Sequence, residues 1–269
     1  MLADPEKTVI CPGVHDGLTA RVALNVGFDA LYMTGAGTAA SRLGQPDLGL
    51  TTVDDMATNA DTGFGGPLMV ARTTEKYVLQ GVAAFHIEDQ VTTKRCGHLG
   101  GKELVDTPPF VARIRAAAAA RSRMGSDIVI IARTDALQSR GYEEAVSRLK
   151  AAVEAGAEVA FLEGMQTKEQ MAQVVKDMAP TPCLLNMVSG GVTPLVNTRE
   201  AKELGYKIVL WPIAGMFCRE LKSTGEIKNR YKADGKIDGG VRDVFELCGL
   251  SACVEFDKEV GGASFANGA

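Results

Sequence analysis

The sequence predicts an α/β fold of the (β/α)₈ TIM-type barrel class, because strand-like and helix-like segments alternate along its length. Apolar runs rich in β-branched residues are followed by amphipathic, often Ala-rich segments, as expected for buried parallel strands with crossover helices. Polar groups end nearly every run, and barrel enzymes build their sites from the carboxyl ends of many strands. The 269 residues suit a barrel of about 250. The alternative, a doubly wound open sheet, would gather its polar residues at one switch point.

The expected strands can be placed in order along the chain. They cover residues 8–14, 28–37, 81–90, 127–136, 157–164, 182–188 and 206–214. One strand should lie between the second and third of these runs, but "TTVDDMATNA" passes straight into "DTGFGG". We therefore expect an abbreviated or missing third strand. No composition break interrupts the pattern, so residues 1–269 are predicted to form one barrel domain, with 230–269 as an extension that packs on it or on a neighbouring subunit.

Composition restricts the class of partner. Hydrophobic residues make up 46% and charged residues 23% of the chain, and the formal net charge is −4, which argues against a nucleic-acid partner. No apolar run approaches the ~20 residues of a membrane span, and the first residues lack the features of a secretory signal. Six cysteines without a CxxC pair indicate reduced thiols. We expect a cytoplasmic protein without a membrane partner, with a mitochondrial location left open.

Three acids lie at predicted strand ends or in the loops that follow them. They are Asp47 in "QPDLG", Asp61 in "NADTGFGG" and Glu88 in "HIEDQ". Carboxylate oxygens of this kind suit Mg²⁺ or Mn²⁺. Asp61 alone would more often be a turn residue before Gly63. The three acids together favour a metal site.

Two further strand ends carry residues that can bind an anion. Arg133 ends "DIVIIAR", where it either pairs with an acid such as Asp135 or Glu163 or points at an anionic ligand. Asn186 ends "CLLN" and either hydrogen-bonds a carboxylate or caps the next loop. His86, within an apolar run, is expected to have a structural role.

Cys96 differs from the other cysteines because charged residues and glycines surround it in "TTKRCGHLGGK". Lys94, Arg95 and His98 are expected to lower the pKa of its thiol, and the glycines would let the loop move as a lid. No second cysteine or histidine pair stands at zinc-ligand spacing. A Cys96–His98 nucleophile pair is conceivable, but residues two apart in a loop rarely present a base well, so an acid/base role ranks higher.

The motifs occur in an order that resembles the isocitrate lyase/phosphoenolpyruvate mutase superfamily. They are "LYMTGAGTAAS", "QPDLGLTT", "DTGFGG", "HIEDQV", "KRCGHLGGK", "IARTDAL", "AEVAFLEG" and "NMVSGGVTP". The resemblance implies a (β/α)₈ barrel that binds Mg²⁺ (or Mn²⁺) and a small hydroxy- or keto-dicarboxylate. It also implies a homotetramer, a dimer of dimers that exchange a helix.

The resemblance also implies roles for individual residues. Asp61 and Glu88 would surround the metal with Asp47 nearby, and Cys96 on the gating loop would be the general acid. Arg133 and His98 would join Cys96 in catalysis. The substrate would be bound by Tyr32, Thr34, Gly35, Ala36, Gly97, Glu163, Asn186 and Pro212.

The resemblance also bears on the reaction. A cysteine in "KRCGH" is similar to the lyases of the superfamily rather than to its phosphonomutases. Pro212 in "LWPIAG" favours cleavage of a 2,3-dimethylmalate-like acid to pyruvate and propionate, because proline offers apolar surface to a methyl group. A serine there would go with oxaloacetate hydrolysis. Oxaloacetate hydrolase and methylisocitrate lyase are the alternatives.

The chain departs from the family pattern at two places. The first acid of a D-x-D motif before "TGFGG" is replaced by Asn59, so one metal ligand is lost. "WPIAGM" runs directly into "FCRELKSTGEI", which predicts a shortened eighth helix. A truncated, inactive paralogue is therefore a further alternative.

Overall fold

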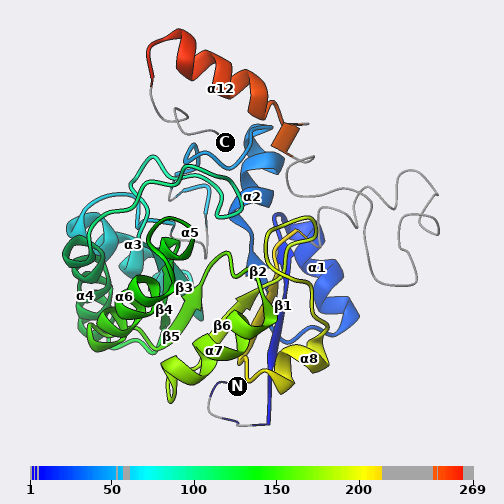
Figure 1. Cartoon of the computed structure of the whole chain (residues 1–269), viewed down its shortest axis with the longest axis vertical. Coiled ribbons are helices and arrows are strands. Elements are labelled where there is room, and N and C mark those ends of the chain that lie inside the picture. The colour runs from blue at the N-terminus through cyan, green and yellow to red at the C-terminus, as the bar shows by residue number, and fades with distance from the viewer. Residues whose placement is uncertain are drawn as a thin grey trace.

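The computed structural model describes residues 2, 4, 6–52, 54–56, 61–213, 245–246 and 248–262, and within them seven parallel strands form one curled sheet (Figure 1). Their order across the sheet is β2-β1-β7-β6-β5-β4-β3. The strands are β1 (Val9–Val14), β2 (Tyr32–Met33), β3 (Ala84–Glu88), β4 (Val129–Thr134), β5 (Val159–Leu162), β6 (Cys183–Asn186) and β7 (Ile208–Trp211). Each lies within a predicted strand range, and the predicted TIM-like α/β class is confirmed.

Helices connect successive strands and cover the outer face of the sheet. They are α1 (Gly17–Val26), α2 (Gly35–Thr38), the π-helix η1 (Ala39–Leu43), α3 (Pro67–Leu79), α4 (Thr107–Arg123), α5 (Ala136–Arg140), α6 (Tyr142–Glu154), α7 (Lys168–Met178) and α8 (Thr198–Glu203). Local sequence sets their ends. Asp16 accepts a hydrogen bond from the Thr19 backbone as the cap of α1, and Gly27 ends that helix at φ 97°.

In the described part of the chain, the sheet is open where the third strand was expected to be abbreviated or missing. β7 pairs with β1, so the first and last strands meet as in a closed barrel. Between β2 and β3, however, no strand occurs in the described part of the chain. Asp61 bridges part of this gap, because its carbonyl accepts a hydrogen bond of 2.8 Å from the backbone N–H of Glu88. Within the described residues, the prediction of an abbreviated or missing third strand is therefore confirmed, while Asn59 lies outside these residues.

Two apolar layers hold the sheet. The larger lies between the strands and the covering helices, and it includes Phe85, Phe110 and Leu149. The smaller fills the inside of the curl, where Phe161 and Leu184 of neighbouring strands meet. Because alternate residues of a strand face opposite sides, strands that are buried on both faces are almost continuously apolar.

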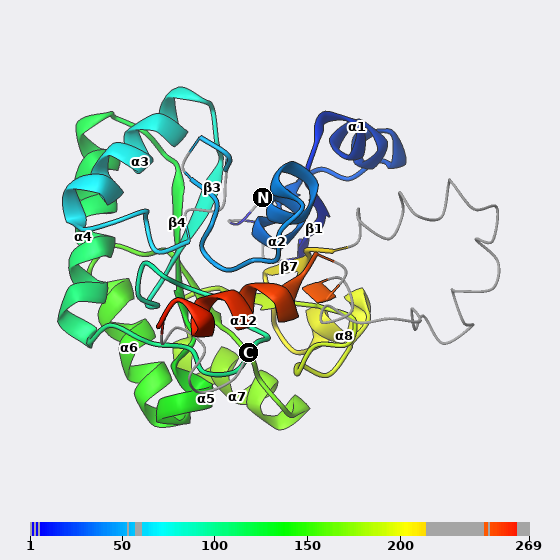
Figure 2. The same cartoon turned by 90° about the horizontal axis from the view of Figure 1, so that it is seen from above.

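A carboxyl-terminal segment packs on the end of the sheet. Figures 1 and 2 show α12 (Leu250–Glu259) beside α2 and lying across that end of the molecule. Phe245 and Leu250 share an apolar cluster with Cys96 and Leu99 of the predicted lid. The predicted short eighth helix lies outside the described residues. Among the helices that the structure describes, none is long and apolar enough to cross a membrane.

The close packing of β1 on the end of β7 gives a test of the fold. A methyl group at Gly13 would lie 1.9 Å from the Pro212 carbonyl oxygen, whereas one at Gly17 would meet nothing within 4 Å. We expect Gly13→Ala to lower the free energy of unfolding by about 1–3 kcal/mol, because a backbone must shift to make room. Gly17→Ala is the matched control and should be neutral or slightly stabilising. Urea unfolding followed by circular dichroism measures both, and equal stabilities would contradict the packing.

Candidate active site

The carboxyl ends of the strands line a cavity of about 40 Å³. Of the predicted site residues, Tyr32, Thr34, Gly35, Ala36, Asp47, Cys96, Gly97, His98, Arg133, Glu163, Asn186 and Pro212 line it. Lys94, Val188 and Ile213 also line it. The other two predicted residues, Asp61 and Glu88, reach this lining through ion pairs with Lys94 and Arg133. The structure thus brings together residues from nearly every strand end.

The predicted lid is a compact loop over this cavity, formed by residues 90–104. A β-bridge between Gln90 and Leu104 closes its base. The Gln90 side chain also ties its middle, because Nε2 donates to the Arg95 carbonyl over 2.9 Å and Oε1 accepts from the Arg95 N–H over 3.2 Å. These internal hydrogen bonds fix the shape of the loop.

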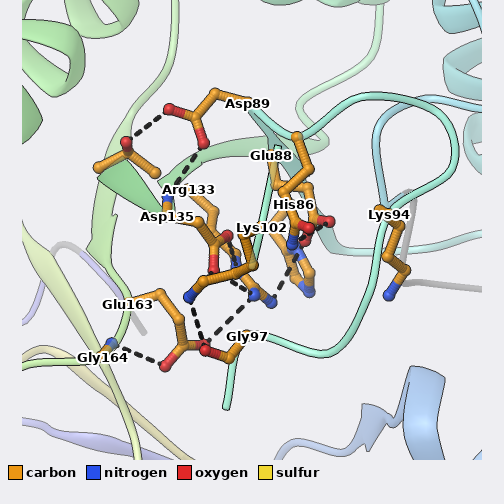
Figure 3. A network of polar contacts seen from close by, with 12 residues as sticks. His86, Glu88, Asp89, Lys94, Gly97, Lys102, Arg133, Asp135, Glu163 and Gly164 are labelled. Atoms are coloured by element: carbon orange, nitrogen blue, oxygen red, sulfur yellow. Dashed lines mark hydrogen bonds and ion pairs between the residues drawn. The ribbon is translucent and has the colours of Figure 1, made fainter. Parts of the chain in front are cut away.

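The lid backbone rests directly on strand-end side chains. A methyl group at Gly97 would lie 2.3 Å from an Arg133 guanidinium nitrogen and 2.7 Å from Glu163 Cγ. Lys102 fastens this contact, since its buried ammonium donates to the Gly97 carbonyl over 2.6 Å and to Asp135 Oδ1 over 2.9 Å (Figure 3). Glycine is therefore required at position 97 for the lid to close in this position.

Arg133 is surrounded by acids. It donates to Asp135 over 2.9 and 3.1 Å, and it forms ion pairs of 3.3 Å with Glu88 and 3.5 Å with Glu163. Of the two interpretations of its sequence position, the pairing with acids is the arrangement seen here. Burial would raise the pKa of Asp135, but the charges and hydrogen bonds of Arg133 and Lys102 together outweigh burial and hold that pKa well below its ordinary value.

Lys94 lies between two of the predicted metal ligands. Its Nζ is 2.9 Å from Asp47 Oδ1, 3.1 Å from Asp47 Oδ2 and 2.9 Å from Asp61 Oδ1. All three side chains are buried. Burial opposes the charge on Lys94, but Asp47, Asp61 and Glu88 outweigh it and raise the pKa of Lys94 well above its ordinary value. Burial likewise raises the pKa of Asp61 against the attraction of Lys94.

Glu88 is the most buried of the predicted metal ligands. Its Oε1 accepts a hydrogen bond of 3.1 Å from Gln90. Its Oε2 accepts no hydrogen bond within the described ranges, and it lies 3.3 Å from the Arg133 guanidinium. Burial raises the pKa of Glu88 to about 8. The charges of Arg133 and Lys94 oppose this rise only in part.

The acids fit a divalent cation by their chemistry but not by their present arrangement. Asp47, Asp61 and Glu88 offer the carboxylate oxygens that Mg²⁺ prefers, and Glu88 Oε2 accepts no hydrogen bond in the part of the chain described. However, no three Asp, Glu, His or Cys side chains among the described residues converge on a common point. Lys94 already bridges Asp47 and Asp61.

The expected low pKa of Cys96 is wrong. Burial, followed by the charge of Asp47, raises the pKa of this thiol to about 12, and Lys94 and Arg133 reduce the rise only in part. Arg95, which was expected to help, donates instead to the Gly100 carbonyl over 3.1 Å. Cys96 is therefore a protonated thiol held against the cavity, which suits a proton donor and not a resting thiolate nucleophile.

His98 does not act as the base of a Cys96 pair in this arrangement. Burial lowers the pKa of His98, so the imidazole is neutral. Its Nδ1 accepts a hydrogen bond of 3.4 Å from the Val192 backbone, and its Nε2 lies 3.8 Å from Glu163 Oε1. Asn186 donates to Glu163 Oε2 over 3.0 Å, so it orients this acid and does not cap a loop. Its Oδ1 has no hydrogen-bond partner in the described part of the structure.

Two further residues that line the cavity, Tyr32 and Thr34, are held in place by nearby hydrogen bonds. Tyr32 Oη lies 2.9 Å from His86 Nε2, and burial holds the pKa of His86 well below its ordinary value, so a neutral imidazole positions the phenol. Thr34 caps α2, and its Oγ1 accepts a hydrogen bond of 3.2 Å from Gly37. The predicted structural role of His86 is thus a hydrogen bond to a cavity residue.

Sequence reasoning missed a buried layer beneath the cavity. Asp89 accepts hydrogen bonds from the Thr134 hydroxyl over 2.6 Å and from Arg148 over 3.1 Å. It also accepts one of 2.9 Å from the Asp135 N–H (Figure 3). Arg148 also donates to the Val105 carbonyl at the base of the lid. This layer fixes the backbone that carries the strand-end charges. The sequence hint was a pair of adjacent acids at the end of one strand.

Comparison with known proteins agrees with the geometry. The family model for phosphoenolpyruvate phosphomutase matches residues 1–217. The 2,3-dimethylmalate lyase of Eubacterium barkeri is 42% identical over 231 residues, with 80% of this chain and 79% of the relative covered. The 2-methylisocitrate lyase of Aeropyrum pernix is 39% identical over 227 residues, with 79% and 72% covered. These curated relatives are named lyases.

Solved structures give the same result. A crystal structure of 2,3-dimethylmalate lyase, described as a PEP mutase/isocitrate lyase superfamily member, superposes with a TM-score of 0.79 at 50% identity and covers 100% of this chain and 95% of that one. Oxaloacetate acetylhydrolase in complex with 3,3-difluorooxalacetate superposes with a TM-score of 0.79 at 46% identity and covers 98% and 96%. The chain therefore belongs to the phosphoenolpyruvate mutase/isocitrate lyase superfamily.

Proposed function

We propose that this chain is a carbon–carbon lyase that cleaves a 2-hydroxy dicarboxylate of 2,3-dimethylmalate type to pyruvate and propionate. The observation that carries the proposal is Cys96, a buried and protonated thiol that the lid holds against the cavity. Cleavage breaks the C2–C3 bond, C2 becomes the carbonyl carbon of pyruvate as its hydroxyl proton passes to water, and C3 receives the electron pair. Cys96 would then donate its proton to C3 as the general acid.

The substrate would be bound by side chains that pair with each other in this structure. Arg133 would exchange part of its contact with Glu88 or Glu163 for a substrate carboxylate, and Asn186 Oδ1 would accept a hydrogen bond from the substrate hydroxyl. Gly35 and Ala36 present first-turn N–H groups of α2, which lack acceptors within the helix. A cavity of about 40 Å³ holds a few waters but no dicarboxylate, so the lid must open for entry.

Mg²⁺ or Mn²⁺ is the proposed cofactor. Asp61 and Glu88 would hold it, with Asp47 nearby. The cation would act as a Lewis acid that stabilises negative charge on the substrate oxygen. The raised pKa values of Asp61 and Glu88 support this assignment, because carboxyl groups that burial destabilises as anions gain from a nearby cation.

Pro212 favours the lyase reaction over hydrolysis of oxaloacetate. It lines the cavity beside Ile213 and Val188, which together give an apolar wall suited to a substrate methyl group. Oxaloacetate carries no such methyl. Oxaloacetate acetylhydrolase is nevertheless the second candidate, because a solved structure of that name is 46% identical over nearly the whole chain. Methylisocitrate lyase is the third, on the curated relatives of that name.

We further propose that residues 1–269 form one domain and assemble as a homotetramer in the cytoplasm. Exposed apolar side chains support an assembly. Leu24 and Val26 on α1 are 56% and 69% exposed, and Phe256 and Val260 at the carboxyl-terminal helix are 64% and 63% exposed. Phe256 and Val260 are four residues apart and lie on one side of the helix, and such exposed apolar pairs are typical of sites of protein contact.

The reaction can be tested with a panel of substrates. We expect pyruvate from 2,3-dimethylmalate, measured with a coupled lactate dehydrogenase assay, and little from methylisocitrate. Cys96→Ala should lower kcat by about 10²–10⁴-fold, because the proton donor is removed. Cys253→Ala on α12 is the matched control and should keep its activity.

Three outcomes separate the candidates. Oxalate and acetate from oxaloacetate would support the hydrolase instead. Preferred turnover of methylisocitrate would support the third candidate. Absence of turnover on every acid, with folded protein and added Mg²⁺, would indicate an inactive paralogue.

The fit of the lid gives a second functional test. Gly97→Ala should reduce kcat/KM by about 100-fold, because its methyl group would hold the lid away from Arg133 and Glu163. Gly100→Ala is in the same loop and would meet nothing within 4 Å, so its kcat/KM should stay within about threefold. Equal kinetics for the two variants would show that closure against Arg133 is not needed for turnover.

A further inference from the structure

We propose that Phe245 of the carboxyl-terminal segment is a positioning residue for the lid, because its ring packs against the lid and keeps the Cys96 thiol at the cavity. The sequence predicted only that residues 230–269 are an extension that packs on the barrel. The inference rests on the proposed function only for the step in which the thiol acts. Its consequence is that the lid and the carboxyl-terminal segment open together.

An apolar cluster joins the carboxyl-terminal segment to the lid. Phe245 is 0% exposed and lies in one buried cluster with Cys96 and Leu99 of the lid. Val188 and Ile213, which line the cavity, belong to the same cluster. Burial of an aromatic ring removes a large apolar surface from water. The ring therefore holds the lid to the end of the sheet by apolar contact, in addition to the ion pairs of the lid lysines.

The same segment also packs beside the loop that receives the Cys96 backbone. The Cys96 N–H donates to the Asp47 carbonyl over 3.0 Å. Leu48, the next residue, and Val254 of α12 are partly buried against the cluster that contains Cys96. Figure 2 shows α12 lying across this end of the molecule. The carboxyl-terminal segment thus packs beside both partners of the hydrogen bond that positions the thiol.

Alkylation of Cys96 tests this role without turnover. Phe245→Ala removes the ring, whereas Phe245→Leu is the matched control that keeps an apolar side chain in the cluster. At one fixed pH, iodoacetamide should modify Cys96 of Phe245→Ala at least about tenfold faster than Cys96 of the wild type, because the lid opens more often. Phe245→Leu should stay within about threefold of the wild type. An unchanged rate for Phe245→Ala would overturn the proposal.

Cys183 of β6 provides an internal control in the same samples. It is 2% exposed and lies in the apolar layer between the sheet and the helices, away from the lid cluster. Peptide mass spectrometry reads the modification of both thiols. The rate at Cys183 should stay within about twofold of the wild type in each variant. Equal acceleration at both thiols would show that the ring stabilises the whole fold, and it would overturn the specific role at the lid.

Hydrogen exchange in low concentrations of urea tests the coupling on the unmodified protein, so it decides the proposal even if Phe245→Ala does not fold. The Cys96 amide reports on the lid. The Cys253 amide, which donates to the Gly249 carbonyl over 3.0 Å, reports on α12. The two amides should show the same free energy of opening and the same dependence on urea. Opening of either segment at a urea concentration that leaves the other protected would overturn the proposal.

Steady-state kinetics provide a readout that a general loss of stability would not give. For Phe245→Ala, kcat should fall about tenfold while KM changes less than about threefold, because the ring positions the proton donor and the strand ends bind the substrate. Phe245→Leu should recover most of kcat. A higher KM at an unchanged kcat would overturn the proposal.

The two proposals fail separately. Pyruvate formation together with an unchanged alkylation rate at Cys96 of Phe245→Ala would retain the lyase and reject the positioning role. Faster alkylation of Cys96 in Phe245→Ala, together with no turnover by the wild type on any acid of the panel, would do the reverse.

Discussion

The Asp135 carboxylate holds Arg133 of β4 and Lys102 of the lid at the same time, and the arrangement of the cavity depends on this shared contact. Arg133 donates to it over 2.9 and 3.1 Å, and Lys102 over 2.9 Å. Lys102 then reaches the Gly97 carbonyl, so one buried anion joins a strand end to the loop that covers it. The backbone N–H of Asp135 donates a hydrogen bond to Asp89, which fixes the Asp135 backbone.

Buried charges of this kind destabilise the fold unless each is paired with an opposite charge. Residues of the lid supply several of these partners. Lys94 neutralises Asp47 and Asp61 on one side of the cavity, while Lys102 serves Asp135 on the other. Removing one member of such a set leaves an uncompensated charge, which is far more destabilising than replacing the set together. Closure of the lid therefore neutralises charges at the strand ends. When the lid opens, water, metal or substrate must replace the contacts that the lid lysines make with these acids.

Much of this fold could be predicted from the sequence, because its signals are local. Apolar β-branched runs predicted the strands. The absence of such a run before "DTGFGG" predicted the gap between β2 and β3. Residues at strand ends were correctly expected to meet, since parallel strands point the same way. The charge partners were harder to predict. Lys94 and Lys102 reach acids far along the chain, at Asp47 and Asp135, and no spacing rule connects them. The pKa of Cys96 was predicted in the wrong direction because its charged neighbours were visible in the sequence and its burial was not.

The central claim is that buried ion pairs hold the lid as an ordered, closed element over the strand ends. Hydrogen–deuterium exchange of the peptide that spans residues 90–104 tests this most directly. The Arg95 and Cys96 amides donate to Gln90 and Asp47, so they should exchange at least about 100-fold more slowly than in an unstructured chain. Exchange at the unstructured rate would contradict the account.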